Sequence, residues 1–278
     1  MAKALGTAII SADSRQCYRE LAIGTAKPSH EEMEGIPHYF IDSHDLKDQV
    51  TAADYESYGL NILEELFKIH DDVVLVGGSG MFVDALCIGL DPIPANDDIR
   101  QEFIELHDQK GLEHLQELLS EQDPEYYSEV DIQNPNRVIR ALEVIKITGK
   151  TFSSQRKRSP KKRPFETVRF VLNHEREVLY ERINHRVDLM IEAGLEKEAK
   201  SVMNQRELSS LNTVGYKELY AHYDGEYSRE EAIDLIKRNS RRYAKRQITW
   251  LKRHPESHWI DWTNVEEVTD KILEISKK

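Results

Sequence analysis

The chain has 278 residues, of which 39% are hydrophobic and 32% charged, and its formal net charge is −12. This length suits one large domain or a domain with an insertion. No apolar run reaches the ~20 residues that a membrane-spanning helix needs, and the first residues lack the apolar core of a signal peptide. Two cysteines are too few for a disulfide framework or a structural zinc site. We therefore expect a cytoplasmic protein that does not contact a membrane.

Short strands and longer helices alternate along the chain. In chain order we predict a strand over residues 8–11, a helix over 51–68, a strand over 73–76, helices over 81–87, 97–119 and 137–147, and a strand over 168–172. A helical stretch over 179–203, broken at Ala193-Gly194, a helix over 230–251 and a strand over 258–261 follow. The run Val73-Val74-Leu75-Val76 is continuously apolar, which is typical of a strand buried on both faces of a parallel sheet. The pattern predicts an α/β fold with a mostly parallel sheet.

We divide the chain into three regions. Residues 1–92 are expected to form an α/β core, and residues 93–164 a mainly helical region. Residues 165–278 supply the remaining core strands and long helices, among them a basic helix over 230–253. Pro160 and Pro164 bracket a basic stretch that is expected to be an exposed loop.

Positive charge is concentrated in two stretches of this acidic chain. Residues 155–163 and 237–253 hold six and eight basic residues and no acidic residue. A solvated basic face would explain such stretches, but the lack of compensating acids favours binding of a polyanion. In the second stretch, basic residues recur at spacings of three and four, so that they can converge on one phosphate group. They are Arg238, Arg241, Arg242, Lys245 and Arg246. The alternative is a surface helix whose cations cover an apolar stripe.

Two further segments are candidates for chemistry. Asp13 follows the first predicted strand, and ligands of open α/β sheets bind at the carboxyl ends of strands. Its carboxylate can accept a proton, and the alternative is an Asx turn or a helix cap. Residues 77–80, Gly-Gly-Ser-Gly, lie between a strand and a helix, where a ligand can approach the backbone and an anion is favoured. The alternative is a tight turn that needs glycine for its geometry.

Six segments, in this order, resemble the tRNA dimethylallyltransferase family. They are SADSRQ at 11–16, GTAKP at 24–28, GGSGMF at 77–82, NRVIRALE at 136–143, VGYKE at 214–218 and AKRQITW at 244–250. The resemblance implies a P-loop kinase-like α/β core with helical additions. It also implies transfer of a dimethylallyl group from dimethylallyl diphosphate to N6 of the adenosine that follows the tRNA anticodon on its 3′ side, with release of diphosphate. Mg²⁺ is the implied cofactor, and a monomer is expected.

The resemblance carries site residues onto this chain. Asp13 matches the family's general base, and Arg242 on the basic helix would stabilise the leaving diphosphate. Ser79 stands where a Thr is usual and keeps the hydroxyl. The implied catalytic residues are Asp13, Ser79 and Arg242. The implied contacts with the tRNA anticodon stem-loop are Asp13, Ser14, Arg15, Gln16, Ser79, Arg100, Asn136, Arg137, Val138, Ile139, Arg140, Lys237, Arg238, Asn239, Ser240, Arg241 and Arg242. No metal ligand or cofactor-binding residue is assigned.

One family feature does not occur in these residues. The phosphate-binding run Gly-x-x-x-x-Gly-Lys-Ser/Thr is not found, and the resemblance places roughly twenty further residues, one strand and this loop, before Met1. We therefore expect the chain as written to bind tRNA and to hold dimethylallyl diphosphate poorly. Two alternatives stay open: a P-loop-type kinase or prenyltransferase that acts on a free nucleotide, and a tRNA-binding protein without catalytic activity.

Overall fold

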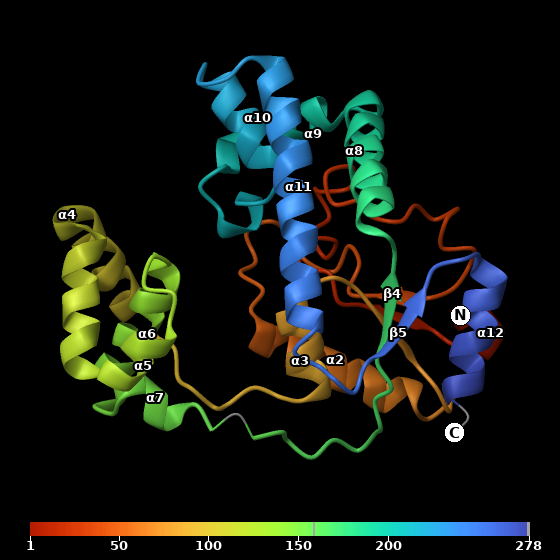
Figure 1. The fold of residues 1–278 in the computed structure, drawn as a ribbon, viewed down its shortest axis with the longest axis horizontal. Helices are drawn as coiled ribbons and strands as arrows, with labels where there is room; N and C mark the ends of the chain where they lie inside the picture. The colour runs from red at the N-terminus through yellow and green to blue at the C-terminus, as the bar shows by residue number, and fades with distance from the viewer. Residues whose placement is uncertain (158, 277–278) are drawn as a thin grey trace. The chain divides into compact units, whose positions relative to one another are not determined.

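The computed structural model describes residues 1–157 and 159–276, and Arg158 of the first basic stretch lies outside them (Figure 1). The chain divides into two compact units. Residues 1–88 and 163–278 together form the first, called here the core unit. Residues 89–162 form the second, called here the helical unit. The core unit is therefore built from two stretches of the chain, which the helical unit separates in the sequence.

Parallel strands lie at the centre of the core unit. The strands β1 (Ile9–Ser11), β2 (His38–Tyr39) and β3 (Val74–Val76) form one sheet in the order β2-β1-β3, and β1 runs parallel to both neighbours. The strands β4 (Phe170–Asn173) and β5 (His258–Asp261) form a second, parallel pair. The predicted α/β class with parallel strands is confirmed. The two-residue strand β2 was not predicted.

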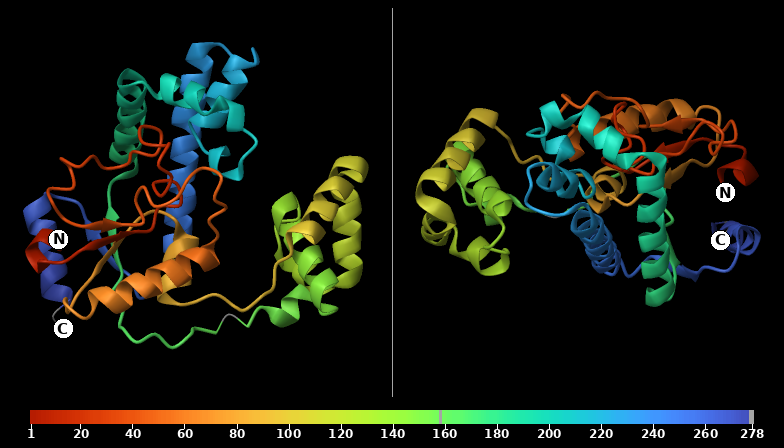
Figure 2. Two further views of the ribbon diagram at one scale, coloured as in Figure 1. Left: turned by 180° about the vertical axis from the view of Figure 1, so that it is seen from behind. Right: turned by 90° about the horizontal axis from the view of Figure 1, so that it is seen from above.

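Helices supply most of the rest of the core unit. They are α1 (Ala2–Leu5), α2 (Ala52–Leu66), α3 (Gly80–Cys87), α8 (Arg176–Ala193), α9 (Leu195–Ser201), α10 (Tyr216–Tyr223), α11 (Arg229–Leu251) and α12 (Val265–Ser276), with the short 3₁₀ turns η1 (Met203–Gln205) and η2 (Ser209–Leu211). Capping boxes start α2 at Thr51 and α11 at Ser228. The break expected at Ala193-Gly194 within 179–203 is confirmed, because Gly194 adopts φ 104° and ends α8 there. In both views of Figure 2 the two ends of the chain lie on the same side of this unit.

An aromatic cluster in the core fixes the end of β1. Tyr55 of α2 stacks on Phe82 of α3 with ring centroids 4.4 Å apart, and Phe40 meets Tyr55 edge-on at 4.7 Å. The buried hydroxyl of Tyr55 donates to the backbone oxygen of Ser11 at 2.9 Å. A buried phenol that did not donate would carry a desolvation cost. The cluster therefore ties α2 and α3 to the last residue of β1.

The helical unit has its own hydrophobic core. It contains α4 (Asp97–Gln122), α5 (Pro124–Glu129), α6 (Pro135–Thr148) and α7 (Phe152–Gln155). Gly111, at φ 81°, divides α4 into two helical parts, which corrects the single helix expected over 97–119. Leu115 and Leu119 from α4 pack with Val138 and Leu142 from α6. Among the described residues of both units, no helix has the length and apolar character needed to cross a membrane.

Candidate functional site

Asp13 forms a turn directly after β1. Its Oδ1 atom accepts the backbone N–H groups of Arg15 at 2.8 Å and Gln16 at 3.2 Å, so the local Asx turn considered from the sequence is present. In the described part of the chain, its Oδ2 atom accepts no hydrogen bond from the protein. The turn thus holds the carboxylate in one orientation and leaves Oδ2 available as a proton acceptor.

The glycine-rich loop 77–80 packs against the end of β1. The Ser79 N–H donates to the backbone oxygen of Ala12 at 3.0 Å. A Cβ atom at Gly77 would lie 2.3 Å from the carbonyl carbon of Ala12, so only glycine permits this approach. The Ser79 side chain does not cap α3. The loop therefore brings Ser79 to the strand end that carries Asp13, with its hydroxyl not committed to the helix.

Helix α11 holds the same loop from the other side. Gln247 Nε2 donates to the backbone oxygen of Gly78 at 2.9 Å, and a Cβ atom at Gly78 would lie 2.0 Å from that nitrogen. The Trp250 ring covers Gly80, where a Cβ atom would lie 2.3 Å from it. The Trp250 indole also donates to Asp84 of α3 at 3.1 Å. These contacts fix the helix that carries Arg242 to the loop that carries Ser79.

His254 belongs to a polar cluster next to this contact. The Asp84 Oδ1 atom lies 3.3 Å from both Arg169 Nη2 and His254 Nε2. The Arg169 guanidinium lies 5.3 Å from the Trp250 ring centroid. Across the residues that the structure describes, no group of three or more His, Cys, Asp or Glu side chains is placed to hold a metal ion. Asp84 of α3 therefore joins His254, which follows α11, to Arg169, which precedes β4.

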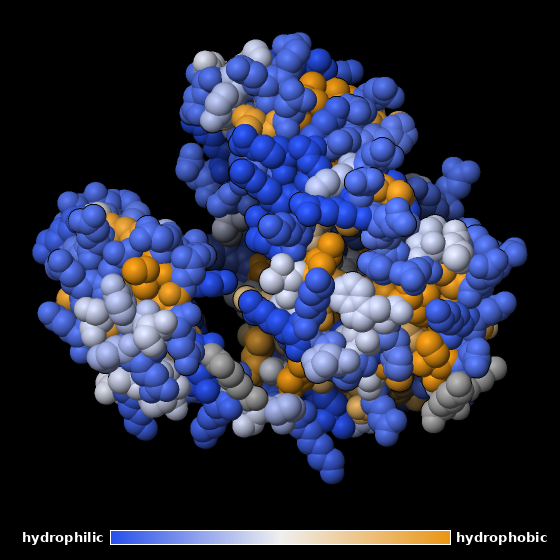
Figure 3. All heavy atoms as spheres, in the orientation of Figure 1, coloured by the Kyte–Doolittle hydropathy of each residue, from blue (hydrophilic) through white to orange (hydrophobic). Residues whose placement is uncertain are grey.

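The basic residues of helix α11 lie on two sides: one side contacts α8, and the other is exposed. Lys237 pairs with Asp188 of α8 at 2.6 Å, and Arg241, one turn later, donates to Asn184 of the same helix. Four other cations of α11 are exposed and form no ion pair in the described part of the chain: Arg238, Arg242, Lys245 and Arg246. In Figure 3 the most hydrophilic surface lies over the middle of this helix. The second side is the one free to meet an anion.

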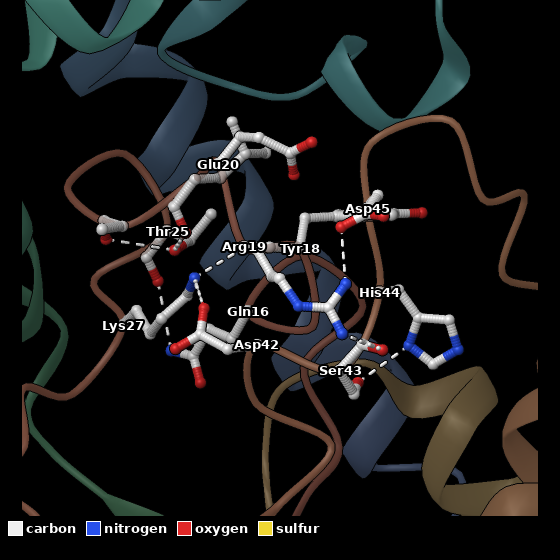
Figure 4. A network of polar contacts seen from close by, with 12 residues as sticks. Gln16, Tyr18, Arg19, Glu20, Thr25, Lys27, Asp42, Ser43, His44 and Asp45 are labelled. Atoms are coloured by element: carbon white, nitrogen blue, oxygen red, sulfur yellow. Dashed lines mark hydrogen bonds and ion pairs between the residues drawn. The ribbon is translucent and has the colours of Figure 1, made fainter.

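Arg15 and Gln16 make contacts within the protein. Arg15 Nε donates to the Thr213 hydroxyl at 2.6 Å. Gln16 Nε2 donates to the backbone oxygens of Thr25 at 3.2 Å and Ala26 at 3.1 Å. Figure 4 shows Gln16 and Thr25 in the same polar network as Lys27, which donates to the Tyr18 backbone oxygen at 2.6 Å. Both predicted site residues therefore shape the loop that follows Asp13. No side-chain hydrogen bond is found for Ser14 in the described residues.

Sequence reasoning missed Glu198, which organises this loop. Its Oε2 atom accepts the backbone N–H groups of Ala22 and Ile23, both at 2.8 Å. Its Oε1 atom accepts the N–H of Gly24 at 2.8 Å and the hydroxyl of Tyr216 at 2.6 Å. One carboxylate thus joins α9, α10 and residues 22–24. In the sequence, the GTAKP segment indicated that this loop is a family feature. No motif near Glu198 indicated that its carboxylate binds the loop.

Four of the residues predicted to contact tRNA are engaged within the helical unit. Arg100 and Arg140 lie beside the buried carboxylate of Glu143, and Val138 and Ile139 lie in the core of this unit. Glu143, 1% exposed, accepts from Arg140 Nη1 at 2.8 Å and lies 3.6 Å from Arg100 Nη1. It also accepts the N–H of Asn96 at 2.9 Å. The side chains of Val138 and Ile139 are buried in the core of this unit. Of the predicted contacts on α6, this leaves Asn136 and Arg137 exposed.

Both cysteines are expected to be unreactive in the folded protein. Burial raises the pKa of the Cys17 thiol to about 12 and also raises that of Cys87. Because the thiolate is the reacting form, neither side chain reacts quickly at neutral pH. Mass spectrometry after brief iodoacetamide treatment should show no adduct on the native protein and two adducts after denaturation. Rapid labelling of the native protein at Cys17 would contradict its burial.

Comparison with known proteins identifies the family. The sequence model of the IPP transferase family matches residues 16–254. The chain belongs to this family. A tRNA dimethylallyltransferase of Cytophaga hutchinsonii is 47% identical over 273 residues, which cover 98% of this chain and 90% of the relative. The predicted resemblance is confirmed.

Solved structures of IPP transferases have the same fold. A full-length tRNA isopentenylpyrophosphate transferase of Bacillus halodurans is 41% identical, with a TM-score of 0.69 over 99% of this chain and 87% of that chain. A tRNA isopentenylpyrophosphate transferase of Staphylococcus epidermidis is 31% identical, with a TM-score of 0.70 over 99% of this chain and 92% of that chain. The IPP transferase match includes Ser79 and Arg242 and begins just after Asp13. The predicted P-loop-type class is confirmed by these neighbours.

Proposed function

We propose that this chain transfers a dimethylallyl group from dimethylallyl diphosphate to N6 of the adenosine that follows the tRNA anticodon on its 3′ side, and releases diphosphate. Family membership and the relatives' names support this reaction. The observation that supports it most strongly is the arrangement at the end of β1. There the oriented Asp13 carboxylate follows Ala12, which accepts the Ser79 N–H, and Gln247 of α11 donates to the same glycine-rich loop. An oriented base, a hydroxyl and a row of exposed cations are the groups that this reaction needs.

Asp13 is proposed to take the proton from the adenine amine. The lone pair of this amine is delocalised into the ring, so the amine is a weak nucleophile until its proton is removed. As the N6–C1 bond forms, the C1–O bond to diphosphate breaks, and the diphosphate leaves with the bonding electron pair. The proton passes to Asp13 Oδ2, the oxygen that the Asx turn leaves open. The Ser79 hydroxyl is proposed to hydrogen-bond the substrate beside it.

Arg242 and its exposed neighbours are proposed to stabilise the leaving diphosphate. Mg²⁺ usually keeps several waters and binds through one or two carboxylates together with substrate phosphates. Asp13 and Ser79 offer the protein oxygens available at this edge of the sheet. When bound, Mg²⁺ would neutralise charge on the leaving group.

The tRNA partner is proposed to bind through its anticodon stem-loop. Unpaired loop bases can be extruded so that side chains reach their edges. The exposed cations of α11 and the exposed Asn136 and Arg137 of the helical unit are proposed to contact the RNA backbone, which would make binding dependent on salt. The engaged residues Arg15 and Gln16 would shape the loop that meets the base. We propose that the protein acts as a monomer in the cytoplasm, where its tRNA substrate occurs.

Two arginines of α6 should behave differently. Arg137→Ala should lower the slope of log affinity for stem-loop RNA against log salt by about one unit, as expected for one lost phosphate contact. Arg140→Ala should instead destabilise the helical unit by about 1–3 kcal/mol, since it removes a partner from buried Glu143. Binding titrations at several salt concentrations and urea unfolding measure the two effects. A flattened salt slope with unchanged stability for Arg140→Ala would make it an RNA contact.

A transfer assay tests the proposed function. Labelled dimethylallyl diphosphate, Mg²⁺ and an unmodified anticodon stem-loop are incubated with this chain, and with a second protein in which a glycine-rich phosphate-binding segment precedes Met1. RNA binding is measured in parallel. Transfer of label to the RNA by either protein supports the proposal. RNA binding without transfer by either protein would favour a non-catalytic tRNA binder, and transfer to free nucleotide alone would favour the other alternative.

A further inference from the structure

Tyr243 occupies an unusual position on α11. Residues four apart lie on the same side of a helix. The residues four before and four after Tyr243, Asn239 and Gln247, both hydrogen-bond to other parts of the core unit. Asn239 donates to Glu218 of α10 at 2.7 Å, and Gln247 donates to the backbone of Gly78 at 2.9 Å. Tyr243 itself is 43% exposed, and its hydroxyl makes no hydrogen bond in the described part of the chain. The helix on both sides of Tyr243 is thus tied to the rest of the core unit, while the aromatic ring itself stays partly exposed.

The contacts of α11 on either side of Tyr243 lie close to the Asp13 turn. Gln247, one turn further along, contacts Gly78, and the adjoining Ser79 donates to Ala12, the residue before Asp13. Arg15 of the same turn is anchored to Thr213, just before α10, to which Asn239 is also tied. Burial first, and then the nearby Asp13 carboxylate, raise the pKa of the Tyr243 phenol, which agrees with this placement.

A cation covers one face of the Tyr243 ring. The Arg246 guanidinium lies over the ring, 5.5 Å from its centroid. Arg246 is exposed and forms no ion pair with any residue that the structure describes. Aromatic rings, assisted by arginine, are the usual surfaces on which unpaired nucleobases stack.

We infer that Tyr243, supported by Arg246, is the surface on which the target adenine of the bound RNA stacks, so that its amine is presented to Asp13. The inference rests on the proposed function, because it takes RNA as the ligand. The ring contributes area and orientation, and its hydroxyl is not required. Tyr243 is therefore a substrate-positioning residue, distinct from the cations that meet phosphates.

A double comparison of protein and RNA tests this role. Fluorescence anisotropy measures the affinity for two stem-loops that differ only at the target position, one with adenosine and one abasic. Tyr243→Leu keeps apolar bulk but removes the ring, Tyr243→Phe keeps the ring, and Tyr227→Leu is the control at a similarly exposed tyrosine, 40% exposed. We expect Tyr243→Leu to weaken binding of the adenosine stem-loop roughly tenfold and leave the abasic one unchanged, as one lost stacking contact predicts. Tyr243→Phe and Tyr227→Leu should bind both RNAs as the unchanged protein does.

Each other outcome overturns the inference. Equal weakening on both RNAs would show that Tyr243→Leu acts on the fold or on the backbone contacts, and no weakening would show that the adenine does not stack there. In both cases the unchanged protein still binds RNA, so the result does not count against the proposed function, which the transfer assay tests separately. If the unchanged protein binds neither stem-loop, the proposed function fails and the inference fails with it. Unfolding curves of the three variants confirm that each is folded before binding is compared.

Discussion

Asp13→Asn should lower the rate of prenyl transfer by about 10²–10⁴-fold, the usual contribution of a general base, and leave the affinity for stem-loop RNA within a few fold. The amide oxygen of Asn can still accept the N–H groups of Arg15 and Gln16, so the Asx turn persists. What the variant loses is the second oxygen as a proton acceptor. Single-turnover transfer of labelled dimethylallyl groups, with RNA held above its dissociation constant, measures the chemical step separately from binding.

A second carboxylate of the same N-terminal region provides the matched control. Asp45 pairs with Arg19 at 2.5 Å on the surface, where both side chains are more than half exposed. Exposed pairs of this kind contribute little to stability, and Asp45→Asn should leave transfer unchanged. Near-normal transfer by Asp13→Asn, with a normal unfolding midpoint, would remove the general-base assignment. Loss of transfer in both variants would point to damage to the loop instead.

Local patterns in the sequence predicted most of the fold. The strands β1, β3 and β4 were expected because each is a short, mainly apolar run followed by a turn, and such runs are visible without knowing the neighbours; β5 was also expected, near His258–Asp261. The strand β2 was missed because His38 and Tyr39 form no apolar run; they become a strand only by pairing with Ile9 and Ile10. The break after α8 was marked by Gly194, but its consequence, the separate helix α9, was not.

Contacts between distant segments could not be read from the chain. The spacing of basic residues on α11 correctly placed them on a helix, yet Lys237 and Arg238 look alike in sequence. Only the packing of α8 shows that Lys237 pairs with Asp188 while Arg238 stays exposed. Likewise, Val138 was carried over as an RNA contact because it stands within a family segment, and the structure buries its side chain. The segment was predicted, and the direction of each side chain was not.

Glu198 is the clearest case of a residue that only the fold reveals, and Glu198→Gln should destabilise the protein by about 2–4 kcal/mol. Its two oxygens accept three backbone N–H groups and one hydroxyl, from residues 22–24 and Tyr216. A glutamine amide keeps one oxygen and turns an NH₂ group toward the remaining donors. Two donors then lose their acceptor whichever way the amide is turned, and a charged acceptor is replaced by a neutral one. Urea unfolding should show a lower midpoint with an unchanged slope.

Glu196 on the same helix separates this effect from the loss of any carboxylate. It pairs with Arg229 at 2.9 Å on the surface, so Glu196→Gln should cost less than about 1 kcal/mol. Tyr216→Phe, which removes one of the four donors, should fall between the two variants at about 1 kcal/mol. Prenyl transfer should fall with Glu198→Gln even where the protein is folded, because residues 25 and 26 hold Gln16 beside the Asp13 turn. Equal stability of the Glu196 and Glu198 variants would mean that the loop keeps its shape without this carboxylate, and that the Asp13 turn is positioned by β1 and the Ser79 loop alone.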